Sequence, residues 1–219
     1  MKMKKITGII IALILMFNVF AQDELNTITT AVPFLLIGPD ARAGAMGDVG
    51  VATTPDVNSM HWNPAKLVFN ENDLGASISF VPWLRSLVND INLSYVTGYK
   101  KIGDKQAIGF ELGYFSLGQI TFTDVNGGLI GNYTPNEYLI GSAYSRKLSD
   151  DFSLSVAGKY ILSDLTGGQS AGEIETASGK SFAADVSGFY SKPIRIGGND
   201  IDLAIGCNIS NIGSKIIIL

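Results

Sequence analysis

The residues that could carry chemistry are few in this sequence, and none has the neighbours that chemistry needs. His61 is the only histidine, and no acidic residue lies near it at the spacing of a helical metal site. Cys207 is the only cysteine, which excludes an intramolecular disulfide and a paired-cysteine metal or redox motif. We therefore expect no catalytic residue, no metal site and no cofactor, and we interpret the protein as something other than an enzyme.

Two further motifs have simple structural interpretations. Gly44, Gly47 and Gly50 are not followed by the Gly-Lys-Ser/Thr of a phosphate loop, so they predict a tight backbone path rather than a nucleotide site. Asp150 and Asp151 form a carboxylate pair, but they lie in a predicted hairpin turn, where acidic side chains solvate the backbone. Neither motif changes the expectation of a non-catalytic protein.

The first 21 residues predict a signal peptide for export. Lysines at positions 2, 4 and 5 precede the apolar stretch 6–17, and Val19-Phe20-Ala21 matches a signal peptidase site, so we expect cleavage after Ala21. The alternative is a membrane anchor, but the apolar stretch is shorter than the roughly 20 residues that span a bilayer. A lipoprotein is excluded because no cysteine lies near the predicted cut.

Charge and composition narrow the class of protein. Removing the three lysines of the leader leaves 13 basic against 20 acidic residues, a net charge of −7. An acidic chain without a cluster of Lys and Arg has no electrostatic footprint for nucleic acid, so we exclude nucleic acid as a partner. Only 16% of the residues are charged, which is too little for a fully soluble exterior.

From residue 74 onward, apolar residues alternate with small or polar ones, the pattern of β-strands with unlike faces. The clearest segment is 107–114, where the even positions are apolar and the odd positions are small or charged. Each segment is about 8 to 11 residues long, enough for a tilted strand to cross a membrane. The predicted strands cover residues 74–80, 91–99, 107–114, 138–144, 152–160, 182–190 and 201–210.

A soluble β-sandwich would show the same alternation, but three features favour a transmembrane barrel. Tyrosines recur near the segment ends, where the headgroups of a membrane would lie. Connections alternate between short (100–105, 146–151) and long (116–136, 163–180), with a modest one at 192–200, as in barrels with short periplasmic turns and long outer loops. Polar residues occupy the second face of the strands, as in a wet lumen: Glu111, Lys159, Asp185, Asp202 and Asn208.

The predicted strand count indicates an incomplete barrel. Backbone groups in lipid must all be paired, so the strands need a closed barrel, and single-chain bacterial barrels have an even number of strands. Seven strands would leave two free edges. We therefore expect residues 74–219 to be part of a larger barrel whose intact chain continues for several strands.

Residues 22–73 differ from the strands in character. They contain a glycine-rich run around Gly44, too small in side chains for a membrane strand, and a turn or short helix that ends at Pro64. We expect this segment to fold inside the barrel as a plug.

A family resemblance becomes specific in this segment. The Gly-Asp-Val-Gly-Val-Ala run at 47–52, followed by Trp62-Asn63-Pro64-Ala65, resembles the N-terminal region of FadL-like outer membrane proteins. Within that superfamily, residues 38–42 (Gly-Pro-Asp-Ala-Arg) and 81–93 closely resemble the PorV family, also called LptO, of type IX secretion in Bacteroidetes. The resemblance covers essentially the whole mature chain.

The resemblance implies a plugged barrel of 14 strands when complete, all-β and antiparallel, in the outer membrane. It implies binding to a SprA-like translocon barrel, receipt of secreted proteins with C-terminal signal domains, and delivery of that cargo to a PorU-like sortase complex. A FadL-type transporter of hydrophobic small molecules is the alternative function, because fold does not determine function. A barrel enzyme would need a nucleophile and a base that the sequence does not supply.

Two groups of residues are the candidates for function. The plug residues Asp48, Trp62, Asn63 and Pro64 are candidates for contact with a ligand or with cargo. The cluster Trp83, Leu84 and Arg85, after the Pro82 that interrupts the first strand, is a candidate partner interface, with a membrane-interface anchor as the alternative.

Overall fold

The computed structural model describes residues 32–123, 126–167, 178–196 and 199–213. The predicted signal peptide and the first part of the predicted plug, residues 22–31, lie outside this part of the chain. No helix among the described residues is both long and apolar enough to cross a membrane.

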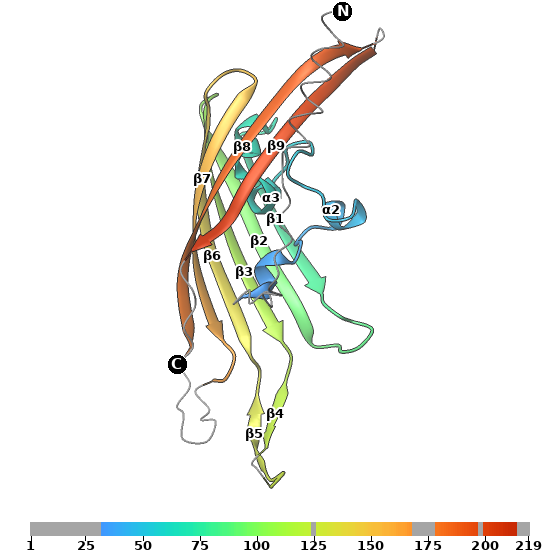
Figure 1. The fold of residues 1–219 in the computed structure, drawn as a ribbon, viewed down its shortest axis with the longest axis vertical. Coiled ribbons are helices and arrows are strands. Elements are labelled where there is room, and N and C mark those ends of the chain that lie inside the picture. The colour runs from blue at the N-terminus through green and yellow to red at the C-terminus, as the bar shows by residue number, and fades with distance from the viewer. Residues whose placement is uncertain (1–31, 124–125, 168–177, 197–198, 214–219) are drawn as a thin grey trace, which may run out of the picture. The chain divides into compact units, whose positions relative to one another are not determined.

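The chain forms a curled, antiparallel, seven-stranded sheet, which confirms the predicted all-β fold and its half-barrel extent (Figure 1). The strand order in the sheet is β1-β2-β3-β6-β7-β8-β9, and every pair of neighbours is antiparallel. The strands are β1 (Leu74–Pro82), β2 (Ile91–Ile102), β3 (Gln106–Leu117), β6 (Asn136–Lys147), β7 (Phe152–Asp164), β8 (Gly179–Ile196) and β9 (Asn199–Gly213).

Two details of the strands differ from the sequence-based expectation. The long connection between β3 and β6 contains a hairpin of its own, β4 (Ile120–Thr123) and β5 (Leu129–Tyr133), which extends beyond the sheet (Figure 1). The strands of the sheet are also longer than predicted, from 9 residues in β1 to 18 in β8. The expected connection at 192–200 is therefore mostly strand, because β8 and β9 continue pairing up to Ile196 and Asn199.

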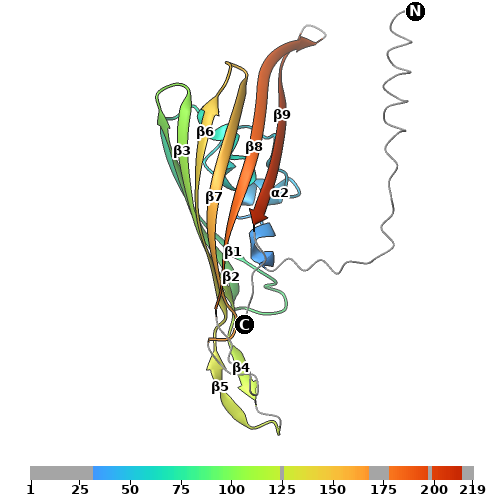
Figure 2. The same cartoon turned by 60° about the vertical axis from the view of Figure 1, so that its left-hand side comes forward.

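Four short helical segments precede the first strand, and those nearest to β1 pack on the concave face of the sheet (Figures 1 and 2). Pro64 starts η2 and cannot continue the preceding helix, so α3 ends at Trp62, as predicted. η2 contacts five strands, β2, β3, β6, β7 and β8. The segments are η1 (Pro33–Leu36), α2 (Ala41–Ala45), α3 (Ser59–Trp62) and η2 (Pro64–Phe69).

The two faces of most strands are divided as the alternation predicted. In β3, Ile108, Phe110 and Leu112 are exposed on the convex face, whereas Glu111 is fully buried on the concave face. β2 reverses this arrangement: its apolar residues Leu93 and Tyr95 point inward and are buried. The reversal follows from the helical segment, which supplies an apolar surface for β2 to cover.

Two apolar clusters join the helical segment to the sheet. One contains Phe34 and Ile37 with Leu93, Phe115 and Leu139. The rings of Phe34 and Phe115 stack with their centroids 5.9 Å apart. The second cluster places Met60, Leu67 and Val68 against small residues of the sheet such as Ala107, Ala143 and Ala157. The small side chains of the concave face thus make room for the helical segment.

Candidate functional site

The concave face of the sheet holds residues 62–69, here called the anchor, by hydrogen bonds from side chains of four strands. Ser145 Oγ donates to the carbonyl of Pro64 at 2.6 Å, and Ser153 Oγ donates to the carbonyl of Ala65 at 2.6 Å. These serines are fully buried on β6 and β7. Both acceptors are backbone carbonyls at the start of η2, so side chains of the sheet bond directly to the backbone of the helix.

The anchor is also bonded to β8 and β9. The amide N–H of Ala65 donates to Ser187 Oγ of β8 at 3.2 Å. Asn208 Nδ2 of β9 donates to the carbonyl of Trp62 at 3.0 Å. Together with the bonds from β6 and β7, these contacts fix one turn of helix to four neighbouring strands.

Asn63 is the centre of this arrangement and is completely buried. Its side-chain oxygen accepts from the N–H of Ala65 and caps η2. Its Nδ2 donates to the carbonyl of Val51 at 2.9 Å and to the carbonyl of Gly188 in β8 at 3.0 Å. One side chain therefore connects the anchor, the sheet and the glycine-rich residues 41–53, here called the arm.

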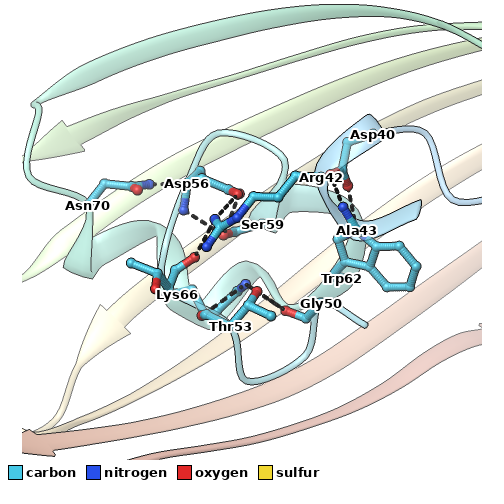
Figure 3. A network of polar contacts seen from close by, with 11 residues as sticks. Asp40, Arg42, Ala43, Gly50, Thr53, Asp56, Ser59, Trp62, Lys66 and Asn70 are labelled. Atoms are coloured by element: carbon cyan, nitrogen blue, oxygen red, sulfur yellow. Dashed lines mark hydrogen bonds and ion pairs between the residues drawn. The ribbon is translucent and has the colours of Figure 1, made fainter. Parts of the chain in front are cut away.

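Lys66 holds the arm from the other side (Figure 3). Its side chain is buried, and Nζ donates to the carbonyl of Gly50 at 2.6 Å and to Thr53 Oγ1 at 3.1 Å and the Thr53 carbonyl at 3.4 Å. Burial lowers the pKa of Lys66 from 10.5 to about 8, and the positive charge of Arg42 adds to this against the opposing effect of Asp56. The role of Lys66 was not predicted from the sequence, because its partners, two backbone carbonyls and the Thr53 hydroxyl, are 13 to 16 residues away.

The start of the arm is held by Asp40 and Arg42 (Figure 3). One oxygen of Asp40 caps α2 by accepting from the N–H of Ala43 at 2.8 Å, and the other accepts from Trp62 Nε1 at 2.8 Å. Arg42 forms an ion pair with Asp56 at 2.9 Å, in which both side chains are partly exposed. These contacts explain why Trp62 lies over the arm.

A charged cluster lies on the concave face beside the anchor. Lys159 Nζ of β7 is 2.7 Å from Asp185 Oδ2 of β8 and 4.0 Å from Glu111 Oε1 of β3. Tyr95 donates from its hydroxyl to Glu111 Oε2 at 2.5 Å. The sequence placed Glu111, Lys159 and Asp185 on the inner face, but only the register of the strands brings them together.

His61 lies beside this cluster, next to Tyr95. Its ring meets those of Trp62 and Tyr95 edge to face, with centroids 4.8 and 6.0 Å apart. Burial, reinforced by the positive charge of Lys159 and opposed by Asp40, lowers the pKa of His61 from 6.5 to about 3. The imidazole is therefore neutral at neutral pH. No group of three or more His, Cys, Asp or Glu residues in the described ranges could hold a metal ion.

Two cavities flank the arm. One of about 480 Å³ is lined by residues 48–53 and Trp62. The other, of about 580 Å³, lies between residues 36–41 with Gly44 and Asp48 on one side and residues 78–83 on the other. Both volumes are in the range of small-molecule pockets.

The structure separates the four predicted plug residues into two pairs. Asn63 and Pro64 belong to the anchor and are buried against the sheet. Asp48 is exposed, adopts a left-handed backbone conformation with φ of 58°, and lines both cavities. Trp62 is partly buried and lines the smaller cavity.

The predicted partner residues Trp83, Leu84 and Arg85 lie together in the connection from β1 to β2. All three are exposed, and Leu84 has a φ of 50°. Leu87, four residues after Trp83, is 78% exposed and adds a further apolar side chain to this connection. The connection contacts the base of the β4–β5 hairpin, because Asp90 accepts a hydrogen bond from the N–H of Gln119 at 2.9 Å.

Comparison with known proteins gives the chain a family. A search of the curated proteins finds no match. The family model described as type IX secretion system protein PorV matches residues 20–218, nearly the whole chain. This agrees with the curled antiparallel sheet and with the motifs at residues 38–52 and 62–65. The chain therefore belongs to the PorV family of outer membrane proteins and is a component of the type IX secretion system.

Proposed function

We propose that this protein binds a SprA-like translocon barrel, receives secreted proteins with C-terminal signal domains, and hands them to a PorU-like sortase complex without catalysing a reaction. Its membership of a secretion-system family supports this role. The observation that carries the proposal is the exposed apolar surface of the β1–β2 connection, where Trp83, Leu84 and Leu87 are 40%, 49% and 78% exposed. Exposed aromatic and arginine residues of this kind are typical of protein–protein interfaces.

The β4–β5 hairpin extends this surface. Leu129 and Ile130 of β5 are exposed, and the hairpin pairs only with itself within the described residues. An isolated two-stranded hairpin is marginally stable in water, so a partner that covers its apolar side chains would stabilise it. The long connections lie at the end of the sheet that faces the cell exterior in bacterial barrels, where translocon and cargo would be met.

In this proposal, residues 1–21 are a signal peptide that is cleaved after Ala21, residues 22–73 form a plug, and residues 74–219 form part of the membrane barrel. The anchor supports the role of the plug, because four strands hold it by hydrogen bonds. A plug that is fixed in this way blocks the lumen. Cargo then moves along the outside of the barrel, on the loops, rather than through it.

The larger cavity favours a second function, transport of hydrophobic small molecules. Its lining is mostly apolar and includes Leu36, Ile37 and Val81, with Asp48 as a polar group at its side. A fatty acid that co-purifies with the protein, and that is lost when Asp48 and Leu36 of this cavity are replaced by alanine, would support transport. Absence of any bound lipid or detergent at this cavity would count against it.

The secretion role is tested by replacing the gene with variants. Trp83→Ala combined with Leu87→Ala should abolish co-purification of the large translocon barrel and reduce surface display of type IX cargo. The matched control is Ile102→Ala with Leu148→Ala, which removes two exposed apolar side chains at the opposite end of the sheet. Normal cargo display in a strain that lacks the gene would contradict the proposed function.

A further inference from the structure

Three strands carry a positive charge on the convex face where they approach the short turns. Lys100 of β2, Arg146 of β6 and Lys192 of β8 are all exposed. The alternation of the strands places each on the face opposite the buried concave residues, such as Tyr99 beside Lys100 and Ser145 beside Arg146. All three strands run toward the short turns, so the three charges gather at one end of the sheet.

The strand register shows where the three cations lie relative to one another along the strands. Lys100 lies across from Ile108, which lies across from Tyr144, so Arg146 is two residues farther toward the turns. Arg146 lies across from Leu154, which lies across from Gly188. Lys192 is therefore four residues farther toward the turns than Gly188. Strands tilted by about 40° and spaced about 4.8 Å apart shift by about one residue per strand at constant depth. The step from Lys100 to Arg146 matches this shift, whereas Lys192 lies about two residues farther toward the turns than the shift alone would place it.

Aromatic residues lie next to these cations on the membrane side. Tyr144 precedes Arg146 by two residues on the same face, and Tyr190 precedes Lys192 in the same way. Tyrosine marks the boundary between hydrocarbon and headgroups in membrane barrels. Arg146 and Lys192 thus lie one outward position beyond that boundary, at the depth of the lipid phosphates.

The opposite end of the sheet has no such excess of charge. The convex-face residues there are the neutral Asn92, Ser116 and Asn136, with one acid, Asp164, and one base, Lys180. The short-turn end of the convex face therefore carries an excess of positive charge and the opposite end carries none, although the chain as a whole is acidic.

We propose that Lys100, Arg146 and Lys192, the basic belt, bind the headgroups of anionic phospholipid at the short-turn end of the barrel. Lys100 and Arg146 form no ion pair with any residue that the structure describes, so their charges are available. Lys192 is 3.4 Å from Asp151, with both side chains partly exposed, and contributes less. Arg146 contributes most, because a guanidinium can hold a phosphate through two hydrogen bonds.

The test uses the full chain purified in detergent and mixed with micelles that contain phosphatidylglycerol or phosphatidylcholine. Retained lipid is counted by native mass spectrometry. The wild-type protein should retain phosphatidylglycerol in preference to phosphatidylcholine. Replacing all three cations by glutamine should lower that preference by about fivefold per cation, on the order of a hundredfold in total. The preference of the wild-type protein should also fall as salt is added.

The matched control removes the same charge elsewhere, with Arg42→Gln, Arg85→Gln and Lys180→Gln, all exposed residues away from the belt. It should keep the preference, and circular dichroism should show that both variants retain their strands. An equal loss in both variants would mean that net charge alone attracts the lipid, and an unchanged belt variant would overturn the proposal. Loss of a co-purifying protein without loss of lipid preference would assign the belt to a protein partner instead.

Discussion

The anchor and the arm both belong to the helical segment before β1, but they are held in opposite ways. The anchor is buried, and four strands bond to its backbone. The arm is mostly exposed, and its hydrogen bonds run to the anchor and to neighbouring residues of the same segment through Asn63, Lys66 and Asp56. The segment before β1 is therefore fixed to the sheet through one turn of helix, and the arm depends on that turn for its position.

The largest effect is expected from Asn63, which joins the two regions. Asn63→Ala removes bonds to the carbonyls of Val51 and Gly188 and to the N–H of Ala65. Unpaired buried groups cost about 1–3 kcal/mol each, so we expect a loss of about 4 kcal/mol in the free energy of unfolding. Urea unfolding in detergent measures this loss of stability. The control Asn72→Ala, at an exposed position, should be nearly neutral; similar stability of both variants would show that Asn63 is not the link.

Lys66 should make the free energy of unfolding depend on pH. Its pKa is about 8 in the folded protein and 10.5 when exposed, so between these values the unfolded chain binds more protons. The free energy of unfolding should therefore rise as pH increases from about 8 to about 10.5, by about 3 kcal/mol. Lys66→Met should lack this component, which the difference between the two unfolding profiles isolates. Identical pH profiles would contradict a buried, charged Lys66.

Gly206 of β9 tests the contact between the arm and the sheet. A Cβ atom there would overlap the carbonyl oxygen of Val51, a backbone group that cannot rotate away. Gly206→Ala should therefore displace the arm, at a cost of about 2 kcal/mol, and leave the anchor in place. Hydrogen exchange should become faster in residues 41–53 and stay slow in residues 62–69. Gly158→Ala, where a Cβ meets open space, is the control; equal protection of the arm in both variants would refute the contact.

The smallest effect is expected from the ion pair between Arg42 and Asp56. The two groups are 2.9 Å apart, but their side chains are 48% and 32% exposed. Exposed pairs contribute less than about 1 kcal/mol, so Arg42→Gln should change stability only slightly. Thermal unfolding at low and high salt measures this. A large, salt-independent loss would mean that Arg42 holds the arm as firmly as Lys66 does.

Much of the sheet could be predicted because strand periodicity is a local property. The alternation at residues 107–114 and 152–160 places lipid-facing side chains on one face, and the structure has β3 and β7 there with those faces. The β4–β5 hairpin was missed because its strands are only 4 and 5 residues long. A period of two is hard to recognise in so few residues.

The candidate site was harder to predict because its contacts are distant in sequence. Trp62-Asn63-Pro64-Ala65 was recognised as a motif, but Asn63 bonds to β8, 125 residues away, and Pro64 bonds to β6, 81 residues away. The burial of Lys66 was not predicted, since no sequence pattern distinguishes a buried lysine beside an apolar stretch from an exposed one. Sequence reasoning found the segment that matters but not what its residues contact.

By itself, the sequence determined that this chain forms antiparallel strands with an apolar and a polar face, joined by short and long connections, because backbone pairing and side-chain alternation are local. The tertiary structure decided the rest. In the tertiary structure, the apolar face of β2 points inward against the helical segment before β1. Glu111, Lys159 and Asp185 come together from three strands, and Asn63 bonds the anchor to β8. Each of these depends on which strand lies beside which and in what register, and alternation along one strand carries no information about its neighbours.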